Sequence, residues 1–143
     1  MDKWCHTGIA GFVVLGSNGE YPLLSAEEKL QTVETVAGHA RAGMPIIAGT
    51  GEESTAETIN LTHACAERGA TAALVVTPHY YGGHMTAAAQ TAHYTQVAEN
   101  APIPVILYNV PKFTHINLAP ETVGRLAAHP NIIGIKDSSG NVA

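Results

Sequence analysis

Charged residues, cysteines and long apolar runs are all scarce in this sequence, and each scarcity excludes a class of protein. Lys and Arg number only seven and are spread along the chain, which argues against a basic surface for nucleic acid or an anionic membrane. No apolar run approaches the roughly 20 residues of a membrane-spanning helix. Cys5 and Cys65 stand far apart and outside any CxxC pattern, so we expect two inert thiols in a reducing compartment.

Signals for targeting and for metal binding are absent as well. The N-terminal residues form neither a signal peptide nor an Arg-rich transit sequence, so we expect a cytosolic chain, or a mitochondrial one if a targeting segment has been lost. The eight histidines show no HxxxH or HExxH spacing, and Cys–His ligand spacing is lacking too. His79 and His84 are the best remaining pair. We expect no metal there and no cofactor elsewhere.

What the sequence does contain is a regular succession of short apolar runs. Apolar residues make up 45% of the chain and the formal net charge is −5, a globular composition. The runs begin roughly 30 residues apart, the length of a βαβ unit. They do not alternate with polar residues, as expected of strands buried on both faces of a parallel sheet. The five runs are Phe12–Leu15, Pro45–Ala48, Ala72–Val76, Pro104–Leu107 and Ile132–Ile135.

Helix signals fill the segments between these runs. Ser25 and Ser54 each stand three residues before a Glu, the capping-box pattern that begins a helix. Gly69 suits the position just after the end of the second helix. We expect a third helix from Thr86 to Asn100 and a fourth from Pro120 to about His129.

The alternation of strands and helices predicts an α/β fold with two possible architectures. One is an open doubly wound sheet, and the other is part of a (β/α)8 barrel. A dinucleotide-binding sheet would carry a GxGxxG segment after a strand. The segment Gly49-Thr50-Gly51 lacks the third glycine, so the sequence gives little support to a nucleotide site.

Two residues at predicted strand ends could carry chemistry, because ligands of parallel α/β sheets bind at the C-terminal ends of the strands. Lys136 follows four apolar residues, which would desolvate its ammonium group, lower its pKa and leave the neutral amine that attacks carbonyls. The alternative is a lysine that extends to solvent or pairs with Asp137. Tyr108 also ends an apolar run, where its phenol could exchange protons with an intermediate. The alternative is a tyrosine that only packs its ring.

A glycine-flanked turn follows the first apolar run and contains Ser17 and Asn18. Backbone amides and polar side chains in such a turn can hold a carboxylate. The alternative is a turn that enters a helix without binding a ligand.

Four segments at these strand ends indicate a family when they are taken together. They are GSNGE at 16–20, TPHYY at 77–81, YNVP at 108–111 and GIKDSSG at 134–140. Their order and spacing resemble the dihydrodipicolinate synthase/N-acetylneuraminate lyase family over essentially the whole chain, and most closely its 4-hydroxy-2-oxoglutarate aldolase branch. The resemblance implies a (β/α)8 barrel that assembles into a homo-oligomer, namely a tetramer. It also implies that the small-molecule substrate is pyruvate or another 2-oxo acid.

The resemblance also implies a role for individual residues. Lys136 in GIKD would form an imine with pyruvate, and Tyr108 in YNVP would donate and accept the protons. Ser17 and Asn18 match the pair that grips the pyruvate carboxylate, and Ser17 would join the proton relay. One tyrosine of TPHYY, for which we favour Tyr81, would complete the relay by reaching into a neighbouring subunit.

Departures from the family pattern bear on the reaction. Synthases of lysine biosynthesis usually carry an arginine two residues after the YNVP proline, where it holds the carboxylate of the second substrate. Phe113 stands there and cannot form an ion pair, although its neighbour Lys112 could compensate. The Ser17-Asn18 pair, and Ser138 as a substrate-contacting serine, match the aldolase branch. We therefore expect a lyase that acts on a 2-oxo acid such as 4-hydroxy-2-oxoglutarate, with 4-hydroxy-tetrahydrodipicolinate synthase as the alternative.

The length of the chain corresponds to only part of such a barrel. A complete (β/α)8 barrel takes roughly 250 residues or more, and the five runs correspond to about the second to sixth strands. We expect residues 1–143 to form a single partial barrel domain, from a fragment or truncated gene product. Five strands cannot close the barrel, and open sheet edges favour aggregation. A non-catalytic chain that only pairs with another barrel fragment is therefore a further alternative.

Overall fold

The computed structural model describes residues 2–141, in which five strands alternate with helices. All five apolar runs are strands, which confirms the predicted order. β4 and β5 each continue two residues beyond their apolar run, so Tyr108 and Lys136 lie within strands and not after them. The strands are β1 Phe12–Val14, β2 Ile46–Gly49, β3 Ala72–Val76, β4 Val105–Asn109 and β5 Ile132–Asp137.

Three long helices connect the first four strands, and shorter helical turns occupy the loops. The long helices are α2 Ala26–His39, α3 Thr55–Glu67 and α4 Ala87–Asn100. The short ones are α1 Asp2–Cys5, η1 Ser17–Gly19, η2 Tyr21–Leu23, η3 Gly82–His84, α5 Pro111–Thr114 and α6 Pro120–Leu126. α6 begins at the predicted proline but ends at Leu126, short of the predicted end near His129.

The two predicted capping boxes differ in the structure. At the start of α2, the Ser25 hydroxyl accepts a hydrogen bond from the Glu28 amide. The Glu28 carboxylate accepts one from the Ser25 amide in return, so the capping box is complete. At the start of α3, Ser54 accepts the Glu57 amide, whereas the Glu57 carboxylate accepts a bond from Asn60. The sequence pattern therefore located both helix starts but described the side-chain bonds of only one.

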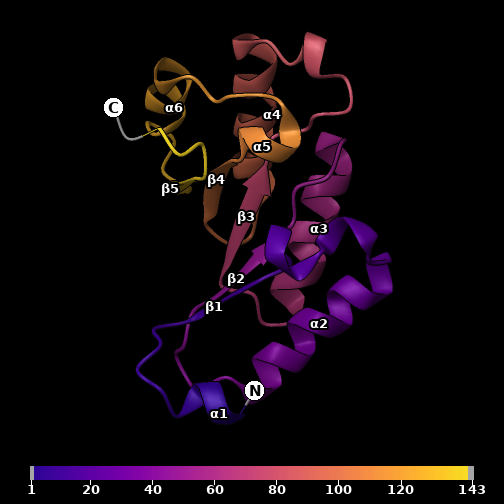
Figure 1. Ribbon diagram of the computed structural model, residues 1–143, viewed down its shortest axis with the longest axis vertical. Coiled ribbons are helices and arrows are strands. Elements are labelled where there is room, and N and C mark those ends of the chain that lie inside the picture. Colours follow the sequence, from indigo (N-terminus) through magenta and orange to yellow (C-terminus); the bar gives the residue numbers. More distant parts are fainter. Residues whose placement is uncertain (1, 142–143) are drawn as a thin grey trace.

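The sheet is parallel, and its strand order decides between the two predicted architectures. Each strand pairs with the next one in the chain, in the order β1-β2-β3-β4-β5. A doubly wound sheet reverses its order at a switch point, whereas a barrel always adds the next strand to the same edge. The fold is thus part of a (β/α)8 barrel. Figure 1 shows the sheet open, with α2, α3 and α4 along one side of the strands.

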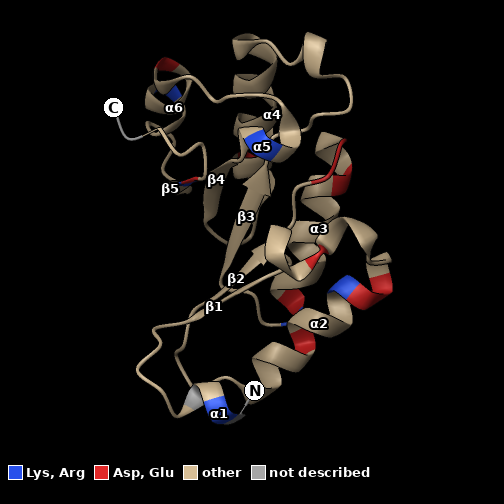
Figure 2. Ribbon diagram, viewed as in Figure 1, with Lys and Arg blue, Asp and Glu red and all other residues tan. Residues whose placement is uncertain are grey.

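The two faces of the sheet bury different clusters. Residues 73, 75, 105 and 107 face the helices and form a core with Tyr94 and Val97 of α4. The intervening residues Leu74, Val76 and Tyr108 gather on the opposite face, which would line the interior of a barrel. β1 to β4 contain no charged residue, and Figure 2 shows the charges mainly on α2 and at the start of α3.

A change of register between β4 and β5 sets which face Lys136 occupies. Val105 pairs with Ile132, but Ile106 pairs with Gly134, so Ile133 has no partner on β4. Beyond this bulge, Tyr108 pairs with Lys136 and Asn109 with Asp137. Since paired residues of parallel strands point to the same face, Lys136 joins Tyr108 on the interior face.

The fold also bears on the cysteines and on membrane insertion. Cys65 is fully buried, and burial raises the pKa of its thiol to about 11, as expected of an unreactive cysteine. The side chain of Cys5 lies outside the part of the chain that the structure describes. Within residues 2–141, no helix combines the length and the apolar character needed to cross a membrane.

Candidate active site

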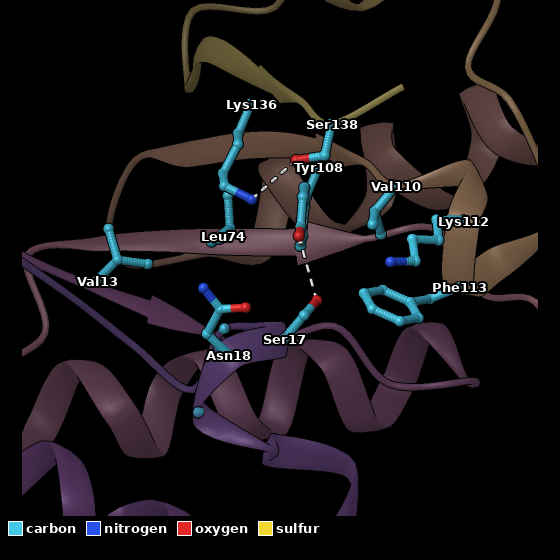
Figure 3. Close-up of a pocket in the computed structure, with 12 residues that line it drawn as sticks. Val13, Ser17, Asn18, Leu74, Tyr108, Val110, Lys112, Phe113, Lys136 and Ser138 are labelled. Carbon is cyan, nitrogen blue, oxygen red and sulfur yellow. Dashed lines mark hydrogen bonds between the residues drawn. The ribbon is translucent and has the colours of Figure 1, made fainter. Parts of the chain in front are cut away.

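An open pocket of about 430 Å3 lies where the C-terminal ends of the strands meet. Five of the six predicted site residues line it, although they lie as far apart in the sequence as Ser17 and Ser138. They come from the turn after β1, from β4 and from the end of β5, as Figure 3 shows. These five are Ser17, Asn18, Tyr108, Lys136 and Ser138.

Lys136 extends across the ring of Tyr108. Its Nζ lies 3.6 Å from the ring centroid, and it donates a 3.2 Å hydrogen bond to Ser138 Oγ (Figure 3). The side chain is exposed, so the predicted desolvation of its ammonium group is wrong for this structure. The physical reason is that β5 is the edge strand of the described sheet, and its residues from Ile133 onward are exposed.

The Tyr108 hydroxyl connects Lys136 to the turn after β1. It lies 3.2 Å from Ser17 Oγ, and the tyrosine as a whole is only 5% exposed. Burial by itself raises the pKa of Tyr108, but hydrogen bonds with Lys136, Ser17 and Ser138 and the charge of Lys136 outweigh it. The pKa of the phenol is therefore held below its ordinary value, which makes proton release easier.

A strained backbone position carries Ser17 to this hydroxyl. Leu15 has φ of 57°, in the left-handed region that is uncommon for leucine, while its side chain is fixed in the core. The Leu15 carbonyl fits only because residue 49 is glycine: a Cβ at Gly49 would lie 2.0 Å from that oxygen. Backbone strain of this kind is common next to functional residues.

Tyr81, the sixth predicted residue, does not line this pocket. Its side chain is 71% exposed, and its ring meets that of Tyr80 edge-on at 5.0 Å between centroids. Glu53 holds the turn before it, because its carboxylate accepts hydrogen bonds from the backbone amides of His79 and Tyr80. The same carboxylate lies 2.9 Å from His79 Nδ1. The contact of Tyr81 with a neighbouring subunit stays a prediction.

Asn109 is a residue whose importance the sequence reasoning did not recognise. It is 2% exposed. The side-chain amide nitrogen donates hydrogen bonds to Asn117 Oδ1 and Asp137 Oδ1, and the amide oxygen accepts one from the Leu118 backbone amide. Its backbone oxygen accepts the Ser138 amide at 2.8 Å. These bonds fix the segment of β5 that carries Lys136. The only sequence signal for Asn109 is its place in the YNVP segment, in which the resemblance assigned a role to Tyr108 alone.

The residues suited to metal binding do not gather in this pocket. Within residues 2–141, no group of three or more His, Cys, Asp or Glu side chains could hold a metal ion. His79, one of the two histidines considered from the sequence, pairs with Glu53. The polar side chains that line the pocket present two amines, a phenol, two hydroxyl groups and an amide.

The chain resembles known proteins in both sequence and structure. Residues 2–143 match the model of the dihydrodipicolinate synthetase family. The chain is 43% identical over 142 residues to 4-hydroxy-tetrahydrodipicolinate synthase of Trichlorobacter lovleyi, covering 99% of the chain and 48% of that protein. A dihydrodipicolinate synthase from Acinetobacter baumannii, solved with pyruvate, superimposes with a TM-score of 0.89 at 45% identity, over 94% of this chain and 46% of that one. YagE of E. coli K12, a member of the same family solved with pyruvate, gives a TM-score of 0.84 at 37% identity, over 91% and 43%.

These relatives also qualify the sequence prediction. Curated relatives with 43–46% identity carry the synthase name and not the aldolase name. The chain spans about half the length of the curated relatives it matches. The family model, the barrel strand order and the motif-bearing pocket all agree, and the chain belongs to the dihydrodipicolinate synthetase family.

Proposed function

We propose that this chain carries the imine-forming site of a class I, pyruvate-dependent lyase. The observation that carries the proposal is the contact of the Lys136 amine with Tyr108, whose hydroxyl in turn meets Ser17. An amine beside a phenol of lowered pKa, in a pocket open to small molecules, is suited to carbonyl addition followed by proton transfer. The pyruvate found in the Acinetobacter baumannii relative supports the choice of substrate.

In the proposed reaction the exposed Lys136 ammonium first gives a proton to solvent, and the resulting neutral amine attacks C2 of pyruvate and forms a carbinolamine. Tyr108 delivers a proton to the departing hydroxyl, water leaves, and an iminium remains on Lys136. The Tyr108 phenolate then accepts a proton from C3, which gives an enamine and restores the phenol. Ser17, bonded to the Tyr108 hydroxyl, passes protons to and from the phenol. Ser17 and Asn18 hold the pyruvate carboxylate, and Ser138 orients the Lys136 amine.

The second half of the reaction is proposed to be that of the named relatives. In 4-hydroxy-tetrahydrodipicolinate synthesis the enamine carbon bonds to the aldehyde carbon of aspartate semialdehyde. The aldehyde oxygen takes a proton, and the product's amine then displaces Lys136 as the ring closes. Identities of 42–46% to curated synthases support this reaction over the aldol cleavage expected from the sequence.

Aldol cleavage of 4-hydroxy-2-oxoglutarate stays the second candidate because of Phe113. This residue lines the pocket and is 57% exposed, at the position where the synthases usually carry an arginine. Cleavage reverses the carbon–carbon bond formation on the same imine, so both reactions use Lys136 and Tyr108 in the same way.

Two measurements test the proposal. Exchange of the pyruvate methyl protons with deuterated water, followed by NMR, reports enamine formation without a second substrate. Turnover of pyruvate plus aspartate semialdehyde is then compared with turnover of hydroxyoxoglutarate. The 143-residue chain is assayed beside a chimera in which it replaces the matching segment of the Acinetobacter baumannii enzyme. Absence of exchange in both proteins refutes the proposal, whereas exchange by a monodisperse, cooperatively folded chain refutes the non-catalytic alternative.

The oligomer and the role of Tyr81 belong to the same proposal. An exposed, edge-on pair of tyrosines is the kind of surface that a neighbouring subunit can cover. Sedimentation of wild type and Tyr81→Ala tests this point. Loss of exchange activity together with a smaller assembly supports a relay across subunits, and an unchanged assembly with full activity contradicts it.

A further inference from the structure

The turn after β3 is attached to the loop after β2 through one carboxylate. Because Pro78 has no amide hydrogen, His79 and Tyr80 carry the first two backbone donors of this turn. Both amides donate to Glu53 Oε2, at 3.0 and 2.9 Å, while Glu53 Oε1 lies 2.9 Å from His79 Nδ1. Successive backbone amides directed at one anion form a concave binding arrangement. Here the anion is a side chain of the protein itself.

The loop that presents Glu53 is itself fixed on both sides. On one side, the Glu52 amide donates to Thr58 Oγ1 at 3.0 Å, and the Glu52 carboxylate accepts a hydrogen bond from Lys29. Thr58 is fully buried and Lys29 is only 8% exposed, so both partners are held in the core. On the other side, Ser54 caps the first turn of α3. The Glu53 carboxylate therefore extends from a backbone that is bonded before and after it.

The tyrosines on the turn depend on this attachment for their position. Tyr80 is 76% exposed and Tyr81 is 71% exposed, and their rings meet each other edge-on. The Tyr81 carbonyl accepts the His84 amide, a bond that lies within the turn and does not fix it to the barrel. An exposed side chain takes its position from the backbone that carries it. The contacts of Glu53 with residues 79 and 80 therefore determine where the two rings are presented.

The same turn borders the candidate active site. His79 lines a second pocket, which shares Ser17, Val110 and Phe113 with the pocket of Lys136. Ser17 is the residue whose hydroxyl meets that of Tyr108. The turn held by Glu53 is thus placed beside the hydroxyl groups of the proposed proton relay.

We infer that Glu53 is a positioning residue for this relay, because it sets where the Tyr81 hydroxyl is presented. The inference rests on the proposed function, which gives Tyr81 a place in the relay of a neighbouring subunit. Glu53 acts through the backbone of the turn and touches neither pyruvate nor the reacting atoms. A phenol displaced by about 1 Å loses its alignment with the next proton carrier, so proton transfer slows. The amount of imine formed at equilibrium on Lys136 does not depend on the relay and stays unchanged.

Amide hydrogen exchange followed by NMR tests the attachment without any turnover. The His79 and Tyr80 amides should exchange at least about tenfold faster in Glu53→Ala than in wild type, because each loses a charged acceptor. Glu53→Gln keeps one acceptor oxygen and should give intermediate rates. Glu27→Gln, which changes an exposed acid at the start of α2, is the matched control and should leave both rates unchanged. Equal rates in Glu53→Ala and wild type overturn the inference.

A double-mutant cycle in the chimera described above tests the effect on the reaction. We expect Glu53→Ala to slow exchange of the pyruvate methyl protons at least about tenfold, with no change in the amount of pyruvate trapped on Lys136 by borohydride. Glu53→Gln should recover part of the rate. Tyr81→Phe should also slow the exchange, and adding Glu53→Ala to it should cause no further loss, because Glu53 acts through the Tyr81 hydroxyl.

Two outcomes of the cycle overturn the inference. Multiplied losses in the double variant would show that Glu53 acts independently of Tyr81. Equal losses of exchange and of trapping in Glu53→Ala would show that Glu53 only maintains the fold. Failure of the wild-type sequence to trap pyruvate refutes the proposed function instead, and the amide exchange then decides whether Glu53 positions the turn.

Discussion

Lys136 pairs with Tyr108 across β4 and β5 because one residue, Ile133, is left unpaired earlier in the strand. Without that bulge, continuing the Val105–Ile132 pairing would place Lys136 opposite Asn109, on the face that carries the helices. The amine and the phenol would then lie on opposite faces of the sheet. The irregularity of β5 therefore assembles the candidate site.

Deletion of Ile133 tests this relationship. We expect the deletion to close the bulge while Gly134, Ile135 and Lys136 keep Ile106, Leu107 and Tyr108 as partners, so pyruvate imine formation should stay close to the wild-type rate. Ile133→Ala, which keeps the bulge and removes only an exposed side chain, should react at close to the wild-type rate. A rate at least about a hundredfold lower in the deletion, in a protein shown by circular dichroism to be folded, would contradict this pairing.

Titration of Tyr108 tests the pKa relationship in the site. Because hydrogen bonds and the Lys136 charge lower the pKa of Tyr108, its phenolate should form at lower pH than that of an ordinary tyrosine. The measurement is the ultraviolet difference between wild type and Tyr108→Phe as pH rises. Ser17→Ala removes one of the lowering bonds and should move the transition to higher pH. If the transition in wild type lies at or above the ordinary pKa of tyrosine, the lowered pKa of Tyr108 is refuted.

Replacement of Asn109 tests how β5 is held. Asn109→Ala leaves the Leu118 amide and the Asp137 carboxylate without their buried partner, so we expect the free energy of unfolding to fall by about 2–4 kcal/mol. Asn117→Ala removes only the exposed partner of Asn109 and should cost less than about 1 kcal/mol. Chemical denaturation measures both values. Equal losses would show that Asn109 is not the centre of this network.

The pH dependence of stability follows from His93. This residue is 6% exposed, its Nδ1 bonds Thr55, and burial lowers its pKa to about 4. Between pH 6.5 and pH 4 the unfolded chain binds a proton that the folded protein does not, so stability falls as pH falls. The loss is on the order of 3 kcal/mol over this range. Denaturation at several pH values should show a weaker dependence in His93→Gln, and identical dependences would contradict the prediction.

The parts of the fold that depend on local pattern were predictable from the sequence. Each apolar run gave a strand, Ser25 and Ser54 marked helix starts, and spacing near 30 residues indicated βαβ units. The strand ends also identified the residues of the pocket, since parallel topology brings all C-terminal ends to one edge. The strand and helix patterns alone did not distinguish a barrel from a doubly wound sheet. The family motifs were needed to favour the barrel.

The parts that depend on pairing between distant segments were not predictable. Nothing in the segment Ile132–Ile135 indicates which residue lacks a partner on β4, because register is set by the whole sheet. The exposure of Lys136 follows from β5 being an edge strand, and the Asn109 network requires residues 117, 118 and 137 to meet. The left-handed conformation of Leu15 depends on the close approach of Gly49.

Borohydride reduction in the presence of pyruvate, followed by peptide mass mapping, tests the central claim most directly. We expect one reduced pyruvate adduct, located on Lys136, that is lost in Lys136→Arg and kept in Lys112→Met. The two lysines line the same pocket, so Lys112 is a matched control for nonspecific amine reaction. An adduct on Lys112, or none in a folded protein, would contradict the assignment of Lys136 as the imine-forming residue.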